Sequence, residues 1–154
     1  MKRFGFKPMA FARGLKNMLA CIGISEPPRD MKEEVMPEWG FSYRHAAQTL
    51  GTEWGRRLLR DDIWVLVLRE FIRDSKDDIA ITDVRFENEA DMIRREGGII
   101  VHMTGRKAEL GTAAGHASEV GIARLVWDET LDNSGDTLAL EKNINELIQR
   151  IYHA

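Results

Sequence analysis

The stretch DIAITDVRFENEADMIRREGGIIVHM, residues 78–103, is the part of this chain that decides its fold class. It opens on a short apolar run at residues 79–81 and continues into a segment whose apolar residues have helical spacing. Gly97-Gly98 and a second apolar run, residues 99–103, follow. A strand, a helix, a glycine pair and a strand within about 26 residues fit the smallest βαβ crossover, which predicts a parallel sheet and an α/β fold.

Charged residues stand directly after the first apolar run. Asp83 and Arg85 lie where the predicted strand ends, with Glu87 and Glu89 close behind. Ligands of parallel sheets bind beyond the carboxyl ends of the strands, which makes Asp83 and Arg85 candidate site residues. The alternative is that Asp83 caps the helix that follows it.

The composition describes an ordinary soluble protein. Its 154 residues are 44% hydrophobic and 31% charged, which suits one domain with a real core. The net charge of −3 argues against general nucleic-acid binding. Cys21 is the only cysteine, so no intrachain disulfide or cysteine zinc cluster is expected. No apolar run approaches the roughly eighteen residues of a membrane span, and no export signal is evident, so we expect a cytoplasmic protein without membrane contact.

The remaining pattern predicts a single α/β domain over residues 1–154. The aromatic residues 4–6 predict a strand, and residues 8–23 a helix. Residues 23–41 predict a loop with one helical turn near 31–36, and Gly51-Thr52 should end a helix that Ser42 caps. Further elements are expected at residues 53–59 and 63–74 (helices), 117–126 (helix), 128–131 (strand) and from Asp136 or Thr137 onward (helix). A polar, lid-like loop is expected at about residues 105–118.

Five segments, in order along nearly the whole chain, resemble the bacteriophage-type deoxynucleoside monophosphate kinases, which are P-loop nucleotide kinases. They are Phe11-Ala12-x-x-Leu15-Lys16, Leu50-Gly-Thr-Glu-Trp-Gly-Arg56, Thr82-Asp-Val-Arg-Phe-x-Asn-Glu89, His116-x-Ser-Glu119 and Asp132-Asn-Ser-Gly-Asp-Thr-Leu138. The resemblance implies a three-layer α/β domain of the P-loop kinase type.

The chain departs from that family in two places. Members begin with a central strand and a GxxxxGK[ST] phosphate loop, whereas this sequence offers only Gly14-Leu15-Lys16-Asn17, without the earlier glycine or a strand. We therefore expect a reduced parallel sheet that lacks the usual first strand. The second departure is Arg13-Gly14, where relatives usually have Asp-Pro, which reverses a charge.

The missing loop leaves several functional hypotheses open. A phosphate loop positions the donor phosphates and Mg²⁺, so we expect no phosphate transfer by this chain as given, and ATP and Mg²⁺ as cofactors only if the loop is supplied. One hypothesis is a kinase-like phage or prophage protein in the host cytosol that binds nucleotide phosphate. The alternatives are an active kinase truncated at its start and a non-catalytic interaction module. Open strand edges would then need a second copy or another protein to cover them.

The resemblance also assigns candidate site residues. Arg56 and Arg57 would contact the phosphate of the acceptor nucleotide, and Arg85 would also face nucleotide phosphate. Asp83 would stand near Mg²⁺, and Arg106 would act from the lid. Trp54 is a candidate for contact with the nucleobase, and Glu89 is a candidate residue of the substrate site. The alternatives are a solvated helix face paired with Glu53 for the two arginines, a helix cap for Glu89, and a core or hinge role for Trp54. Near the lid, His116, Ser118 and Glu119 fit neither a hydrolase triad, since no GxSxG is present, nor a metal site.

Overall fold

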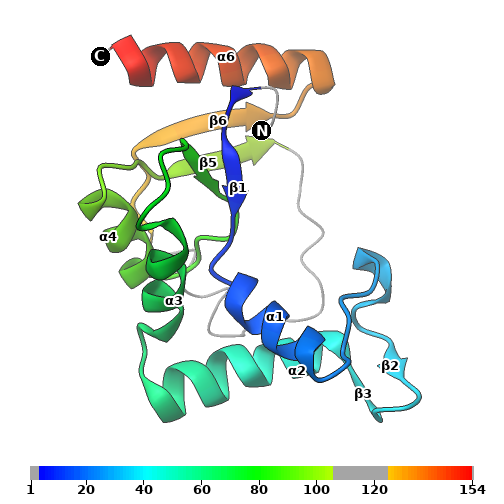
Figure 1. Cartoon of the computed structure of the whole chain (residues 1–154). Helices are drawn as coiled ribbons and strands as arrows, with labels where there is room; N and C mark the ends of the chain where they lie inside the picture. Colours follow the sequence, from blue (N-terminus) through cyan, green and yellow to red (C-terminus); the bar gives the residue numbers. More distant parts are fainter. Residues whose placement is uncertain (1–3, 106–124, 154) are drawn as a thin grey trace. The chain divides into compact units, whose positions relative to one another are not determined.

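The computed structural model describes residues 4–105 and 125–153, a mixture of helices with short strand ladders (Figure 1). The chain packs as two compact units, residues 1–84 and 85–154, and each is described by itself. Unit 1 contains β1 (Lys7–Met9), α1 (Arg13–Cys21), η2 (Arg29–Met31), β2 (Val35–Met36), β3 (Phe41–Ser42), α2 (Tyr43–Gln48), η3 (Thr49–Leu59), α3 (Ile63–Ile72) and β4 (Ile79–Ile81). Unit 2 contains α4 (Glu87–Arg95), β5 (Val101–Gly105), β6 (Glu129–Asn133) and α6 (Thr137–His153).

The sheet of unit 1 is a parallel pair of strands, β1 and β4. Lys7 pairs with Ile79 and Met9 with Ile81. The predicted strand at residues 79–81 is confirmed, but the predicted strand at residues 4–6 is wrong. Gly5 has a φ of +81°, a left-handed conformation that turns the chain just before the pairing begins.

The first helix starts later than predicted. Residues 7–9 are taken up by β1, so Pro8 lies in a strand and α1 begins only at Arg13. α1 buries Leu15 and Leu19 against the rest of unit 1. The predicted helix was therefore about five residues too long at its start, and two of its apolar residues, Met18 and Ile22, are exposed.

The connection between α1 and α2 is more structured than the sequence suggested. A 3₁₀ turn, η2 at Arg29–Met31, lies just before the position near residues 31–36 where a helical turn was predicted. Residues 35–36 of the predicted range form β2, which pairs with β3 in an antiparallel hairpin. The hairpin reverses at Gly40, whose φ is +72°. The Ser42 cap is confirmed, because its hydroxyl oxygen accepts a hydrogen bond from the His45 amide at 3.1 Å.

The expected helix break at Gly51-Thr52 is wrong. The chain passes from α2 directly into η3, an eleven-residue π-helical segment over Thr49–Leu59. Its glycines serve packing against Trp64 of α3: the Trp64 indole N–H donates to the Gly51 carbonyl at 2.7 Å, and a Cβ on Gly55 would lie 2.7 Å from the Trp64 ring. The glycines allow a helix to approach a buried tryptophan, and they do not end it.

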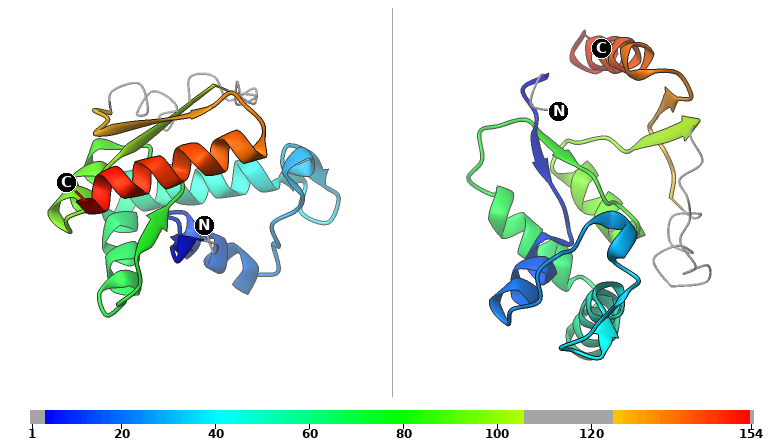
Figure 2. Two further views of the ribbon diagram at one scale, coloured as in Figure 1. Left: turned by 90° about the horizontal axis from the view of Figure 1, so that it is seen from above. Right: turned by 90° about the vertical axis from the view of Figure 1, so that its right-hand side faces the viewer.

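Unit 2 has its own parallel ladder. Val101 pairs with Glu129 and Gly105 with Asn133. Both strands of the predicted crossover therefore pair in parallel, but with other partners: β4 with β1 and β5 with β6. The final helix is confirmed as α6, which runs beside the β5–β6 ladder (Figures 1 and 2).

Asp128 connects the two residues that directly precede the strands of that ladder. Its carboxylate accepts a hydrogen bond from the Ile100 amide at 2.7 Å and pairs with Arg94 at 3.2 Å. Arg94 also donates to the Val126 carbonyl at 2.8 Å. The Ile100 amide and the Arg94 guanidinium lower the pKa of Asp128 against the opposing effect of burial. The Asp128 carboxylate, which stays ionised at neutral pH, thus links the residue before β5 to α4 and to the residue before β6.

We predict that Gly55→Ala destabilises the protein. Alanine is normally better than glycine in a helix by about 1 kcal/mol, but here the new methyl would lie 2.7–2.9 Å from three atoms of the Trp64 indole. Such overpacking costs about 1–3 kcal/mol. The free energy of unfolding, measured by chemical denaturation, should therefore fall. Gly51→Ala is the matched control, because its Cβ would meet only the flexible end of Leu15, at 3.3 Å; equal stability of the two variants would contradict the prediction.

Candidate functional site

Asp83 lies just beyond the carboxyl end of β4, where the sequence placed it. Its two carboxylate oxygens accept hydrogen bonds from the backbone amides of Phe11 at 2.8 Å and Ala12 at 3.0 Å. The Thr82 amide adds a bond to the Met9 carbonyl at 3.1 Å. The alternative in which Asp83 caps the next helix is thus not what the structure shows. Asp83 instead fixes the turn from β1 into α1.

Arg56 is almost fully buried, with 6% of its side chain exposed. Its guanidinium donates to the Asp61 carbonyl at 2.6 Å and lies 3.4 Å from the Asp61 carboxylate. It thereby joins η3 to the turn that precedes α3. The solvated-face alternative is wrong for Arg56. It fits Arg57, whose side chain is 66% exposed and pairs with Glu53 at 3.8 Å.

Arg85 and Glu89 belong to the start of α4. The Glu89 carboxylate accepts hydrogen bonds from the Arg85 amide at 2.8 Å and the Phe86 amide at 3.2 Å. Glu89 is only 3% exposed. A buried carboxylate that accepts from two backbone amides at the start of a helix caps that helix. This is the structural role that was the alternative to a substrate-site role for Glu89.

Trp64 and Trp54 differ in how far they are buried. Trp64 is the buried one, at 4% exposed, and Trp54 is 37% exposed on η3. Trp54 is therefore not a core residue, and its proposed contact with a nucleobase remains a prediction. Arg106, His116, Ser118 and Glu119 lie outside the described residues, as do the lid-like loop and the helix predicted at residues 117–126.

The Arg13-Gly14 departure has a local explanation. A Cβ on Gly14 would lie 2.7 Å from a methyl carbon of Val67, so glycine lets α1 pack against α3. The exposed Arg13 guanidinium lies 5.3 Å from the centre of the Phe71 ring, at a distance typical of a cation–π contact. Arg13 also donates to the Met9 sulfur at 3.1 Å.

A charge network between α1 and η2 was not anticipated from the sequence. Lys16, the one lysine of the GLKN segment, donates to the Glu26 carboxylate at 2.9 Å, and Lys32 donates to the same oxygen. The Tyr43 ring, 3% exposed, lies under Lys32. No spacing rule relates residues 16, 26, 32 and 43, so only the folded chain brings them together.

The three resemblance segments of unit 1 are in physical contact. Asp83 of the third segment binds the backbone of Phe11 and Ala12 of the first. Gly51 of the second lies against Leu15 of the first, where an added Cβ would be 3.3 Å from the leucine side chain. The first motif therefore contacts both of the others: through Asp83 at the carboxyl ends of the parallel strands, which is the edge that binds ligands in α/β sheets, and through Leu15 along α1.

The segment at residues 132–138 forms the turn from β6 into α6. Asp136 accepts a hydrogen bond from the Ala139 amide at 2.8 Å, so it caps α6 as predicted. The Asn143 side chain donates to the Asp132 carbonyl at 3.0 Å. Gly105 is required at the end of β5, because a Cβ there would lie 2.3 Å from the Ser134 amide.

Comparisons with known proteins agree with these motifs. Residues 16–144 match the model of the deoxynucleotide monophosphate kinase family. The chain belongs to this family. It is 30% identical over 128 residues to the deoxynucleoside-5'-monophosphate kinase of Escherichia phage T5. That alignment covers 79% of this chain and 49% of the phage protein, so the chain spans about half the length of this relative. No solved structure matches significantly.

The described residues contain neither a metal-binding cluster nor a membrane-crossing helix. Within residues 4–105 and 125–153, no three His, Cys, Asp or Glu side chains are arranged to hold a metal ion. No helix in that part of the chain has both the length and the hydropathy that a membrane crossing requires.

We predict that Asp83→Ala lowers the free energy of unfolding by about 2–3 kcal/mol, because two backbone amides lose a charged acceptor. Asp83→Asn should lose less, since the amide oxygen still accepts one bond. Asp74→Ala, in the exposed turn after α3, is the control and should be neutral. Chemical denaturation measures all three. A neutral Asp83→Ala would show that the carboxylate does not hold the β1–α1 turn.

Proposed function

We propose that this chain binds a deoxynucleoside monophosphate through unit 1. The observation that carries the proposal is that the first family motif contacts the other two: Asp83 binds its backbone at the carboxyl end of β1, and Leu15 of α1 lies against Gly51. The family assignment and the activity for which the phage T5 relative is named support the choice of ligand.

Arginine side chains are the proposed phosphate ligands. Arg57 is exposed, and Arg56 is held in place next to it by the Asp61 carbonyl. A planar guanidinium binds two phosphate oxygens at once, which suits a monophosphate. Trp54 is a proposed nucleobase contact. Asp83 would act indirectly, by fixing the backbone of the β1–α1 turn.

The sequence lacks the motif that binds Mg-ATP in P-loop kinases. The donor phosphates need a glycine-rich cradle, a lysine and a hydroxyl for Mg²⁺, and the sequence contains no GxxxxGK[ST]. Lys16, in the nearest similar segment, is engaged with Glu26. We infer that the described residues do not hold Mg-ATP by themselves.

A non-catalytic binding module is the second candidate. In the described residues β4 pairs only with β1, and β5 only with β6. Two-stranded ladders leave edges that another strand can extend. A second copy of the chain or another protein would supply that strand.

We predict that the protein binds at least one deoxynucleoside monophosphate in a calorimetric titration with all four. Arg57→Ala should weaken binding about tenfold or more, because a charged phosphate contact is lost. Arg69→Ala, on the exposed side of α3, is the control. Arg56→Ala is less useful, because its loss also removes a buried contact with Asp61. Absence of heat and of thermal stabilisation with all four nucleotides would reject the proposal.

We also predict that residues 1–154 alone do not transfer phosphate from ATP. Positioning and charge stabilisation of the γ-phosphate provide nearly all the catalysis in phosphoryl transfer, and the chain lacks the loop that provides them. A coupled ADP-release assay with each deoxynucleoside monophosphate and Mg-ATP should stay at background. Turnover near the roughly 1–100 s⁻¹ typical of kinases would favour the alternative of an active enzyme.

A further inference from the structure

Trp64 of α3 contacts the π-helical segment η3 at two points. Its indole N–H donates to the Gly51 carbonyl at 2.7 Å. The same ring lies against Gly55, four positions later, where a Cβ would be 2.7–2.9 Å from three of the ring atoms. The Trp64 side chain is rigid and buried, with 4% of the residue exposed. It therefore fixes η3 on one side, both by a hydrogen bond and by close packing.

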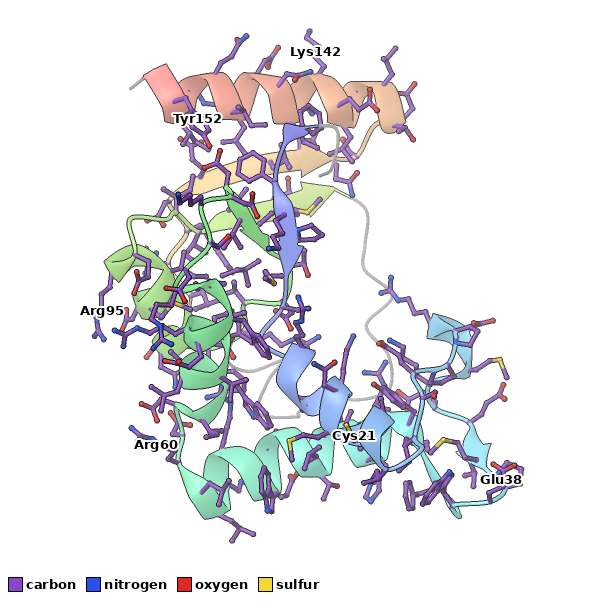
Figure 3. All side chains as sticks on the ribbon, in the orientation of Figure 1. Cys21, Glu38, Arg60, Arg95, Lys142 and Tyr152 are labelled. Carbon is purple, nitrogen blue, oxygen red and sulfur yellow. The ribbon has the colours of Figure 1, made fainter. Side chains whose placement is uncertain are left out.

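These two contacts constrain how η3 is wound. The Arg60 amide, where η3 ends (Figure 3), donates at 3.1 Å to the Gly55 carbonyl, five residues back, which is the π-helical pattern. An α-helix would bond four residues back. A change from one pattern to the other alters each turn by about one residue, so every later side chain rotates around the helix axis. π-Helices are rare and mostly one turn long, so an eleven-residue segment needs support from its neighbours.

The two arginines that follow Gly55 differ sharply in exposure. Only 6% of the Arg56 side chain is exposed, against 66% of the Arg57 side chain. The Arg56 guanidinium donates at 2.6 Å to the Asp61 carbonyl, in the turn between η3 and α3. Neighbouring residues on a helix point in different directions, so the rotation of η3 decides which arginine is buried and which faces solvent.

We propose that Trp64 is the positioning residue of the phosphate site: its contacts with Gly51 and Gly55 hold η3 in the winding that buries Arg56 and exposes Arg57. Without the indole N–H, the Gly51 carbonyl loses a donor, and the common α-helical pattern becomes the more stable one for η3. The consequence for nucleotide binding rests on the proposed function, because it requires Arg57 to be a phosphate ligand. The consequence for arginine exposure does not depend on it.

The first measurement compares the two arginines directly in the full chain. Phenylglyoxal modifies arginine side chains, and tandem mass spectrometry distinguishes Arg56 from Arg57. A buried guanidinium reacts only when the structure opens locally, so Arg57 should react about tenfold or more faster than Arg56 in the unmutated protein. Phenylalanine keeps an apolar ring but has no N–H donor. We expect Trp64→Phe to lower this ratio of rates about fivefold.

The second measurement is a binding titration of the same two proteins with each of the four deoxynucleoside monophosphates. Trp64→Phe should weaken binding about fivefold or more, because Arg57 must then be oriented at the moment of binding. Trp64 itself needs no contact with the nucleotide for this effect.

A control separates positioning from a general loss of stability. Ile24→Val removes one methylene from a residue that is 3% exposed and belongs to neither η3 nor α3. It should destabilise the protein to a degree similar to the loss of one hydrogen bond, yet keep the labelling ratio and the nucleotide affinity. Gly55→Ala is a second test variant, because its methyl displaces the indole ring while Trp64 stays intact. It should shift the labelling in the same direction as Trp64→Phe, and it decides the matter if Trp64→Phe does not fold.

The outcomes distinguish this inference from the proposed function. An unchanged labelling ratio in Trp64→Phe and Gly55→Ala, or an equal change in Ile24→Val, rejects the positioning role of Trp64 and leaves the proposed function standing. A lower ratio in a chain that binds no deoxynucleoside monophosphate rejects the proposed function and retains the control of arginine exposure. A lower ratio with unchanged nucleotide affinity rejects Trp64 as a positioning residue of the phosphate site.

Discussion

The Asp83 carboxylate is the contact on which unit 1 depends. β1 and β4 are each three residues long, and their paired residues are 72 positions apart along the chain. Backbone pairing between strands this short is weak, and closing so large a loop costs conformational entropy. Two charge-assisted hydrogen bonds from Asp83 to the backbone after β1 secure the ends of both strands together. The same bonds set the direction in which α1 leaves the sheet, and so where Leu15 and Leu19 are buried.

The helices of unit 1 pack closely because glycines let neighbouring side chains approach their backbones. Gly14, Gly51 and Gly55 each face a neighbouring side chain at a distance that leaves little or no room for a Cβ. A π-helical segment widens the helix and alters its carbonyl pairing, and in η3 the Gly51 carbonyl accepts from Trp64. One buried tryptophan thus connects α3 to the glycine motif. That motif carries part of the family resemblance, and its glycines have a packing reason that is independent of any ligand.

Several charged residues that resemble site residues have structural partners. Glu89 caps α4, and Arg56 and Asp83 bind backbone groups within unit 1. A buried charge must be compensated, so residues of this kind orient the surrounding backbone even when they do not touch a ligand. The side chains of Arg57 and Trp54 in the same motif are more exposed than that of Arg56.

Local pattern was enough to identify β4, α4, α6, the Ser42 cap and the family itself, because periodicity, capping residues and motif order are properties of neighbouring residues. The strand predicted at residues 4–6 and the break predicted at Gly51 failed because local signals were overruled: Gly5 takes a left-handed turn, and Gly51 meets Leu15 and Trp64. Only the tertiary structure decided that β4 pairs with β1 and β5 with β6, since strand pairing joins distant segments. The tertiary structure alone also brought Lys16, Glu26, Lys32 and Tyr43 together. Burial and charge pairing between distant residues depend on the folded chain, so no regular pattern in the sequence marks them.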